Sequence, residues 1–204
     1  MKNKFKFDTL VLASGNQKKL VELQACLKPL GIEVKPQSEF GVTDADETGL
    51  TFVENAILKA RHAAQATGLP ALADDSGLEV DALQGAPGIY SARYAQLTDE
   101  GSGDAANNEK LLRALQGTEH RCARFQCVLA LMVHGDDPTP LICQGAWEGT
   151  ILAELTGSGG FGYDPLFYLA EHDKTAAQLA PEVKNQVSHR GQAMAKLLAH
   201  LSNA

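Results

Sequence analysis

The stretch Gly-Ser-Gly-Gly-Phe-Gly-Tyr-Asp-Pro at residues 157–165 contains a literal G-x-G-x-x-G pattern at Gly157, Gly159 and Gly162. In a dinucleotide-binding fold, the third glycine opens a helix whose N-terminus holds the pyrophosphate. Here that glycine is followed by Tyr-Asp-Pro and an aromatic run, and proline restricts the residue before it to extended conformations. The stretch therefore predicts a glycine-rich loop leading into a strand. Such a loop suits one wall of a site for a flat ligand, and it argues against a dinucleotide-binding fold.

The rest of the chain mixes helical and strand patterns. Apolar runs and alternation predict strands at residues 7–13, 32–35, 123–133, 141–148 and 150–155, with a tight turn at Gly149 and a further strand from Leu72 that breaks at residues 74–77. Helical spacing predicts helices from the loop at 14–19 to about 30, at 51–67, at 107–115 and from about 188. Residues 98–106 are typical of a polar linker. The pattern predicts an α/β fold with a mixed sheet and flanking helices, and no linker separates two independent domains in residues 1–204.

Length and composition narrow the function classes. A chain of 204 residues suits one domain or two tightly joined lobes, and a net charge of −7 without a basic stripe argues against nucleic-acid binding. Lys6 and Asp8 interrupt any apolar leader, and no run of about 20 apolar residues predicts a membrane span. The four cysteines form no C-x-x-C pair, which predicts reduced core thiols in a cytoplasmic protein.

A short polar segment joins the first predicted strand to the first predicted helix. Its residues are Ser14, Gly15, Asn16, Gln17, Lys18 and Lys19. Backbone N–H groups, the helix N-terminus and a lysine can bind a phosphate there, although the Walker A pattern is absent. The alternative is an ordinary connection in which Asn16 caps the helix.

A pair of adjacent carboxylates, Asp74 and Asp75, is followed by Ser76 and Gly77 near the end of an apolar segment. Adjacent carboxylates repel each other unless a cation lies nearby, and Mg²⁺ typically takes one or two carboxylates together with substrate phosphates. Glu47, from another acidic loop, is a candidate second ligand. The alternative is a solvated turn with local backbone bonds.

Lysines and a histidine supply further candidate contacts. Lys59 is five residues from Glu54, which is too far for a standard helical pair, so it is either free to reach a ligand or an exposed helix lysine. Lys184 precedes a helix for which Ser188 is a natural N-cap. His189 and Arg190 then occupy the first turn, where cations are disfavoured, so they are either functional or surface basic residues. No G-x-S-x-G or H-E-x-x-H pattern is present, so any hydrolytic nucleophile is expected to be an activated water.

Several short motifs occur together in one order. They are Ser-Gly-Asn-x-x-Lys at 14–19, Glu-Thr-Gly-x-Thr-Phe-x-Glu-Asn-Ala at 47–56, Ala-Asp-Asp-Ser-Gly-Leu at 73–78, Gly-Ala-Pro-Gly-Ile-Tyr-Ser-Ala-Arg at 85–93, Gly-Gly-Phe-Gly-Tyr-Asp-Pro at 159–165 and Ser-His-Arg-Gly at 188–191. This set strongly resembles the Ham1/RdgB-like inosine triphosphate pyrophosphatase family, also called dITP/XTP pyrophosphatases. The resemblance covers almost the whole chain. It departs at Ser14, where the family usually has threonine, so the hydroxyl is kept.

The resemblance implies an elongated α/β fold, a single domain over 1–204 with two lobes around a central cleft, and a homodimer. It implies Mg²⁺-dependent hydrolysis of non-canonical purine triphosphates (ITP, dITP and XTP) to the monophosphate and pyrophosphate. Residues 14–19 would bind the triphosphate, Asp75 would be the general base, and Glu47 and Asp75 would hold Mg²⁺. The other implied substrate contacts are Lys59, Ser76, Phe161, Gly162, Tyr163, Asp164, Lys184, His189 and Arg190.

The chemistry of the base is compatible with these roles. Hypoxanthine and xanthine carry a 6-oxo acceptor where adenine has an amino donor, and Arg190 or Lys184 can donate to it. Phe161 would stack on the purine and Asp164 would accept from a ring N–H. Two rival functions remain at this level: a pyrophosphatase for other modified nucleotides, and a nucleotide sensor without turnover.

Overall fold

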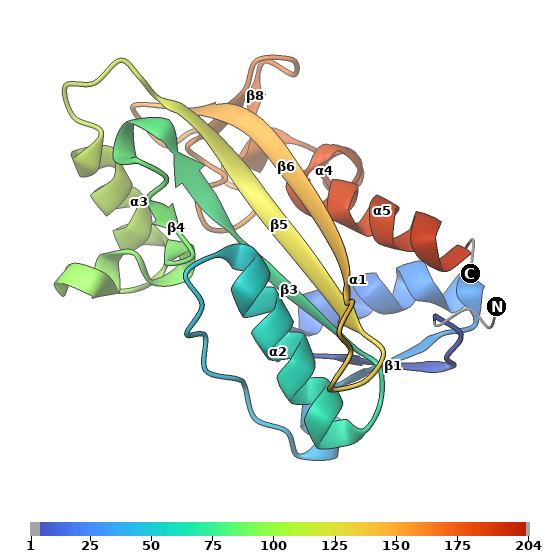
Figure 1. Ribbon diagram of the computed structural model, residues 1–204. Coiled ribbons are helices and arrows are strands. Elements are labelled where there is room, and N and C mark those ends of the chain that lie inside the picture. Colours follow the sequence, from blue (N-terminus) through green and yellow to red (C-terminus); the bar gives the residue numbers. More distant parts are fainter. Residues whose placement is uncertain (1–4, 203–204) are drawn as a thin grey trace. The chain divides into compact units, whose positions relative to one another are not determined.

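The computed structural model describes residues 5–202, which form an α/β fold on a mixed sheet (Figure 1). The strands are β1 (Thr9–Leu12), β2 (Glu33–Pro36), β3 (Ala71–Val80), β4 (Pro87–Gly88), β5 (Cys122–Met132), β6 (Leu141–Ile151), β7 (Phe167–Leu169) and β8 (Lys174–Thr175). Their order is β2-β1-β3-β5-β6-β7-β8, with β4 paired to β3. β1 is parallel to β2 and β3, whereas the pairs β3–β4, β6–β7 and β7–β8 are antiparallel. The mixed α/β fold predicted from the sequence is confirmed.

The helices are α1 (Gln17–Leu27), α2 (Phe52–Thr67), α3 (Gly103–Ala114), α4 (Pro181–Val187) and α5 (His189–Ser202). The chain divides into two compact units. Unit 1 comprises Met1–Asp75, Cys127–Gln144 and Ala193–Ala204, and unit 2 comprises Ser76–Gln126 and Gly145–Gln192. Strands β3, β5 and β6 contribute residues to both units. None of the helices within residues 5–202 is long and apolar enough to cross a membrane.

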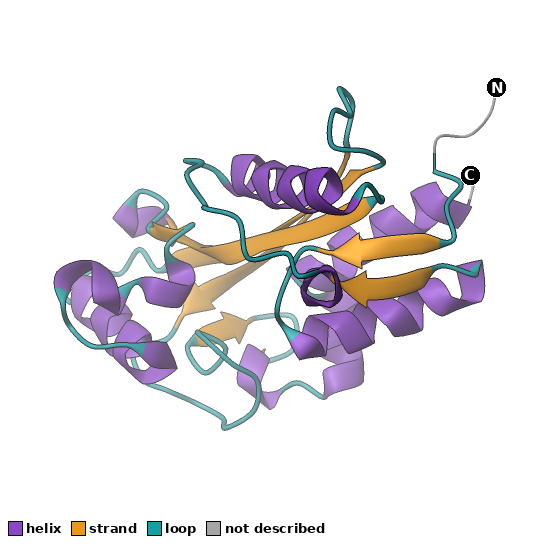
Figure 2. Ribbon diagram, turned by 90° about the horizontal axis from the view of Figure 1, so that it is seen from below, coloured by secondary structure: helices purple, strands orange, loops and turns teal. Residues whose placement is uncertain are grey.

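Unit 1 has helices on both faces of its strands (Figure 2). On one face, leucines of α1 and α5 pack with those of β1, and Leu23, Leu27 and Leu197 are fully or almost fully buried. On the other face lies α2, whose buried alanines at 56, 60, 63 and 64 allow close approach to the sheet. Thr51 caps α2 by accepting a hydrogen bond from the Glu54 N–H, and Gly68 ends it in the left-handed conformation. This rigid framework carries the acidic and basic groups described below.

Unit 2 has an aromatic core. The Phe125 ring centroid lies 4.5 Å from that of Phe167 and 6.5 Å from that of Trp147, in tilted and stacked geometries respectively. Such pairs contribute roughly 0.5–1.5 kcal/mol each beyond the area that they bury. Leu111 and Leu115 of the α3 region complete this core. Unit 2 is therefore held together by large flat side chains, where unit 1 uses leucine and alanine.

Two strands are longer than the sequence predicts. β3 continues through Asp74–Gly77, where a break was expected, because both carboxylates are neutralised by lysines. β6 runs uninterrupted through Gly149, where a tight turn was expected. A Cβ at Gly149 would lie 2.6 Å from the Phe167 ring, so this glycine makes room for β7.

Two further expectations are wrong. Residues 98–106 are no mere linker: α3 begins at Gly103, because its first turns bond to the glycine-rich loop. Cys122 is exposed, not a core thiol, although Cys127 and Cys143 are buried and Cys26 is half-buried. The prediction that Gly162 opens no helix is confirmed, since the chain runs from there into β7.

Candidate functional site

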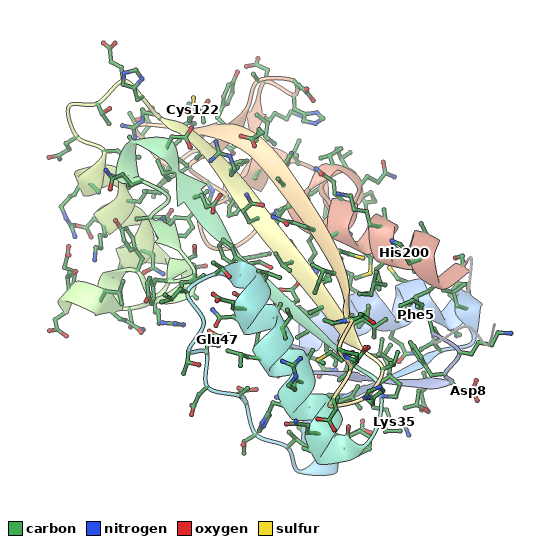
Figure 3. The ribbon with its side chains drawn as sticks, viewed as in Figure 1. Phe5, Asp8, Lys35, Glu47, Cys122 and His200 are labelled. Carbon is green, nitrogen blue, oxygen red and sulfur yellow. The ribbon has the colours of Figure 1, made fainter. Side chains whose placement is uncertain are left out.

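Lys59 holds two carboxylates together in unit 1. Its Nζ donates to Asp75 Oδ1 at 2.7 Å, to Glu47 Oε1 at 2.9 Å and to the Asp74 carbonyl oxygen at 2.9 Å. Asp75 comes from β3 and Lys59 from the middle of α2. Glu47, labelled in Figure 3, comes from the loop before α2. Lys59 is therefore not the exposed helix lysine of the alternative interpretation, since its side chain is 15% exposed and its ammonium group is bound to the carboxylates. It supplies the cation that the adjacent carboxylates require.

The charges of this cluster perturb one another. Burial raises the pKa of Asp75, and its attraction to Lys59 offsets this only in part, while Glu47 and Asp74 raise the pKa further. Burial acts to lower the pKa of Lys59, but Asp75 and Glu47 outweigh it and hold the pKa above its ordinary value. The cluster is thus a partly buried ion triad in which Lys59 stays charged and the Asp75 carboxylate is more basic than usual.

Asp75 also presents an acceptor that the rest of the described chain does not use. Its Oδ2 is buried and has no hydrogen-bond partner among residues 5–202. An unsatisfied buried carboxylate oxygen is costly, and it is the kind of atom that a water or a hard cation satisfies. No group of three or more His, Cys, Asp and Glu side chains in the described chain could hold a metal by itself. The pair Glu47 and Asp75 fits Mg²⁺, which commonly takes one or two carboxylates and completes its shell with phosphates and water.

Asp74 connects this cluster to the loop at residues 14–19. The Lys19 Nζ lies 2.5 Å from Asp74 Oδ1, and the Asp74 side chain is 2% exposed. The buried thiol of Cys127 lies 3.7 Å from Asp74 Oδ2. Asn16 caps α1 by accepting from the Lys19 N–H, and its own N–H donates to Ser14 Oγ. The capping geometry and the lysine coexist here, so the two interpretations of this loop are compatible.

Asn55 is a residue that the sequence analysis missed. It is 1% exposed, and its Oδ1 accepts a hydrogen bond of 2.8 Å from the N–H of Gly49, two residues after Glu47. A Cβ at Gly49 would lie 2.6 Å from Glu54 Cβ. The glycine and the asparagine therefore seat the acidic loop against α2, which places Glu47 beside Lys59. A buried asparagine on an otherwise apolar helix face was the available signal.

Unit 2 carries an exposed aromatic ring beside a lysine. Phe161 is 69% exposed, and the Lys184 Nζ lies 4.9 Å from its ring centroid. The buried Asp164 Oδ2 accepts hydrogen bonds from the Phe161 N–H at 2.7 Å and from Lys184 Nζ at 2.5 Å. The exposed ring, with the Lys184 ammonium over it, offers an aromatic surface on which a flat ligand could stack.

The glycines of the loop fit this arrangement closely. Gly160 has a φ of +77°, and a Cβ there would lie 2.1 Å from Asp164 Oδ2. Tyr163, in contrast, faces the core: it is 3% exposed and its hydroxyl donates to the Ser91 carbonyl oxygen at 2.8 Å. Burial raises the pKa of the Tyr163 phenol. Asp164 and Tyr163 thus anchor the loop, and the Phe161 ring is left exposed at its surface.

The start of α5 brings His189 into the aromatic core of unit 2. Its ring stacks 4.9 Å from Phe125 at 15° and 6.3 Å from Trp147 at 25°. Ser188 Oγ accepts from the Gly191 N–H at 3.3 Å, which confirms the predicted cap. Arg190 follows in the same turn. The cationic first turn noted in the sequence is therefore held by stacking and by a capping serine.

The predicted site residues divide between the two compact units. Unit 1 contains Ser14, Gly15, Asn16, Gln17, Lys19, Glu47, Lys59 and Asp75, and unit 2 contains Ser76, Phe161, Gly162, Tyr163, Asp164, Lys184, His189 and Arg190. The side chain of Lys18 lies outside the described part of the chain. Each unit combines charged side chains with a glycine-containing loop.

The comparisons with known proteins agree with this picture. An α/β protein with adjacent carboxylates, lysines beside them and a short polar loop between a strand and a helix is typical of phosphate-handling enzymes. The chain belongs to the Ham1 family, whose model matches residues 10–200.

Individual relatives are similar over nearly their full length. The dITP/XTP pyrophosphatase of Vibrio parahaemolyticus is 58% identical to the chain, and the match covers 95% of this chain and 96% of the relative. That of Nitrosomonas europaea is 56% identical, and the match covers 95% of this chain and 94% of the relative. A solved HAM1 protein from Coxiella burnetii has a TM-score of 0.93 at 54% identity, covering 97% of this chain and all of its own. The Staphylococcus aureus Ham1 protein has a TM-score of 0.88 at 45% identity, covering 96% and 98%.

Proposed function

We propose that this protein is a nucleoside-triphosphate pyrophosphatase that hydrolyses non-canonical purine triphosphates (ITP, dITP and XTP) to the monophosphate and pyrophosphate. The observation that carries the proposal is the Asp75 carboxylate, with one oxygen bound to Lys59 and the other buried without a partner among the described residues. A binding module needs no basic carboxylate held ready in this way. The names of the relatives support the same activity and substrate class.

Asp75 acts as the general base in this proposal. It accepts the proton of a water that attacks the α-phosphorus, and the bond from that phosphorus to the pyrophosphate oxygen breaks. A carboxylate accepts about four hydrogen bonds or ligands, so Asp75 can bind Lys59 and still take the proton. General-base assistance contributes roughly 10²–10⁴-fold to the rate.

Charge on the triphosphate is neutralised by lysines and a metal. Lys19 and Lys59 lie next to the carboxylates, and Ser14, Gly15 and Asn16 offer donors at the start of α1. Glu47 and Asp75 would hold Mg²⁺, which when bound polarises the phosphoryl oxygens and stabilises the leaving pyrophosphate. By the family resemblance, we also expect a homodimer.

The base is recognised by residues of unit 2. Phe161 stacks on the purine, and Lys184, His189 or Arg190 donates to the 6-oxo group. Adenine presents a donor at that position and leaves the cation unpaired, which rejects it by about 10⁴-fold or more in sites of this type. Asp164 fixes Lys184 and the Phe161 backbone through Oδ2, and its remaining acceptor capacity takes a ring N–H of the purine in this proposal.

A product assay tests the proposal. The protein is incubated with ITP, XTP, GTP or dTTP and Mg²⁺, and monophosphate, pyrophosphate and orthophosphate are resolved. We expect pyrophosphate and monophosphate, with ITP and XTP preferred. Orthophosphate as the first product would contradict attack at the α-phosphorus, preference for dTTP would contradict selection of non-canonical purines, and inertness would favour a sensor. Asp75→Asn should lose activity while remaining folded by circular dichroism.

A further inference from the structure

The first turns of α3 hold both backbone polar groups of Gly162. The Gly162 N–H donates to Asp104 Oδ2 at 2.7 Å, and Asn108 Nδ2 donates to the Gly162 carbonyl oxygen at 2.8 Å. Asp104 and Asn108 are four residues apart and so lie on the same face of the helix. Asn108 Nδ2 also donates to the Asp104 carbonyl oxygen at 2.9 Å. The helix therefore binds the peptide groups on either side of Gly162 at two points.

Gly162 is a position where the loop backbone needs such support. Its φ is +60°, a conformation that side-chain-bearing residues rarely adopt, and a Cβ there would meet nothing within 4 Å. Space is thus not the reason for the glycine. The left-handed conformation directs the preceding residue, Phe161, outward, while Tyr163 turns into the core. The two hydrogen bonds from α3 fix Gly162, the residue between the outward-facing Phe161 and the inward-facing Tyr163.

Asn108 is dedicated to this contact. It is 4% exposed, and its Nδ2 donates to the carbonyl oxygens of Asp104 and Gly162, whereas its Oδ1 is buried with no partner in the described part of the chain. An unsatisfied buried acceptor destabilises a protein, so a leucine or alanine would be expected here if only packing mattered. The hydrogen bond from Asn108 Nδ2 to the Gly162 carbonyl oxygen accounts for an amide side chain at this buried position.

Phe161 depends on its neighbours for orientation. Its ring is mostly exposed, and the Lys184 Nζ lies 4.9 Å from the ring centroid. Its position follows from the backbone bonds on either side: Asp164 binds its N–H, and Asp104 and Asn108 bind the next residue. An aromatic platform that stacks on a base must be held in place before the ligand arrives, since ordering it upon binding weakens affinity.

We propose that Asp104 and Asn108 are positioning residues that fix Phe161 for stacking on the purine, and that they set KM and base preference with little effect on kcat. This inference rests on the proposed function. Neither side chain belongs to the phosphate or metal groups, and both act through Gly162. Loss of either contact frees the loop without altering the reacting atoms.

The test compares Asp104→Ala with the rescue variant Asp104→Asn, which keeps an acceptor oxygen, and with Glu109→Ala as a control. Glu109 is on the same helix, is 74% exposed and pairs with Arg113 away from the loop. For Asp104→Ala we expect the KM for ITP to rise about tenfold, because the variant loses one charge-assisted hydrogen bond that supports binding. We expect kcat to change by less than about twofold, because the reacting atoms are not altered. Asp104→Asn should recover most of the loss, and Glu109→Ala should resemble the unaltered protein.

Amide hydrogen exchange gives a readout that needs no turnover. In Asp104→Ala, and in Asn108→Asp as a second variant, the amides of residues 160–163 should exchange faster, whereas the core amides of β5 should not. Unchanged exchange in the loop would show that Asp104 and Asn108 do not hold Gly162 in place. Faster exchange with an unchanged KM, or a fall in kcat alone, would overturn their role in base binding. If the unaltered protein hydrolyses no nucleotide, the proposed function fails, and exchange still decides whether α3 fixes the loop.

Discussion

Lys59 Nζ lies 2.7 Å from Asp75 Oδ1 and donates also to Glu47, so one ammonium group occupies the position between two carboxylates. The lysine is 15% exposed and Asp75 is 12% exposed, so solvent screens the pair only weakly. A cation supplied by the chain itself keeps the carboxylates ionised before any ligand binds.

Replacing this lysine should destabilise the protein. In Lys59→Met the carboxylates of Asp75 and Glu47 lose their cation, and breaking a buried ion pair in this way typically costs about 3–5 kcal/mol. Urea unfolding without added metal should show this loss of unfolding free energy. Lys35→Met is the control, because Lys35 pairs with an exposed Glu33 at 3.4 Å. Equal stability of the two variants would show that the triad does not support the fold.

Metal addition should stabilise the protein through Glu47. A ligand that binds only the folded state raises its stability by about 2.7 kcal/mol at a hundredfold excess over Kd. We therefore expect Mg²⁺ to raise the melting temperature, and EDTA to reverse this. Glu47→Gln should abolish most of the Mg²⁺ shift, whereas Glu39→Gln, an exposed acid in the same unit, should retain it. An unaltered shift in Glu47→Gln would remove Glu47 as a ligand.

The ion pair of unit 2 should also be required for stability and base binding. Lys184→Met leaves the Asp164 carboxylate, 3% exposed, without its cation. The expected loss is about 3 kcal/mol of unfolding free energy, together with a higher KM for ITP. Lys174→Met, at an exposed position in β8, provides the matched comparison. Normal stability and KM in Lys184→Met would contradict the roles given to this pair.

Thiol reactivity should differ sharply among the cysteines. Burial raises the pKa of Cys143, and Lys196 offsets this only slightly, so its thiolate forms only at higher pH than usual. Iodoacetamide at about pH 8 should therefore alkylate the exposed Cys122 first. Cys127 and Cys143, which are buried, should stay unlabelled until the protein unfolds. Peptide mass spectrometry reads each site. Rapid labelling of native Cys143 would show that unit 1 opens readily.

Local signals in the sequence predicted much of the secondary structure. Gly31 and Gly68 end helical segments in the left-handed conformation, and Thr51 caps α2, because these effects depend on a few neighbouring residues. The continuity of β3 through Asp74 and Asp75 could not be predicted locally, since it depends on Lys19, which is 55 residues from Asp74, and on Lys59, which is 16 residues from Asp75. The sequence around Gly149 predicts a turn, because the close approach of Phe167 to this glycine arises only once the sheet is formed.

The candidate site shows the same division. Residue type and motif order predict Asp75, Glu47 and Phe161 as site residues, but the pairing of Lys59 with both carboxylates could not be predicted from helical spacing. Asp104 and Asn108 lie in and beside a segment that composition alone marks as a linker. Their hydrogen bonds to Gly162 span 58 and 54 residues, and no local pattern records such a contact.

Trp147 is the only tryptophan in the sequence, and its indole stacks 6.3 Å from the ring of His189. The chain thus contains a built-in fluorophore next to the residue that begins α5. Indole emission responds to a neighbouring charge and to stacking, so a change at His189 alters the fluorescence of the whole protein. We therefore expect titration with an unlabelled nucleoside, without Mg²⁺ and without turnover, to change the indole emission as the proposed base-recognition residues of unit 2 are occupied.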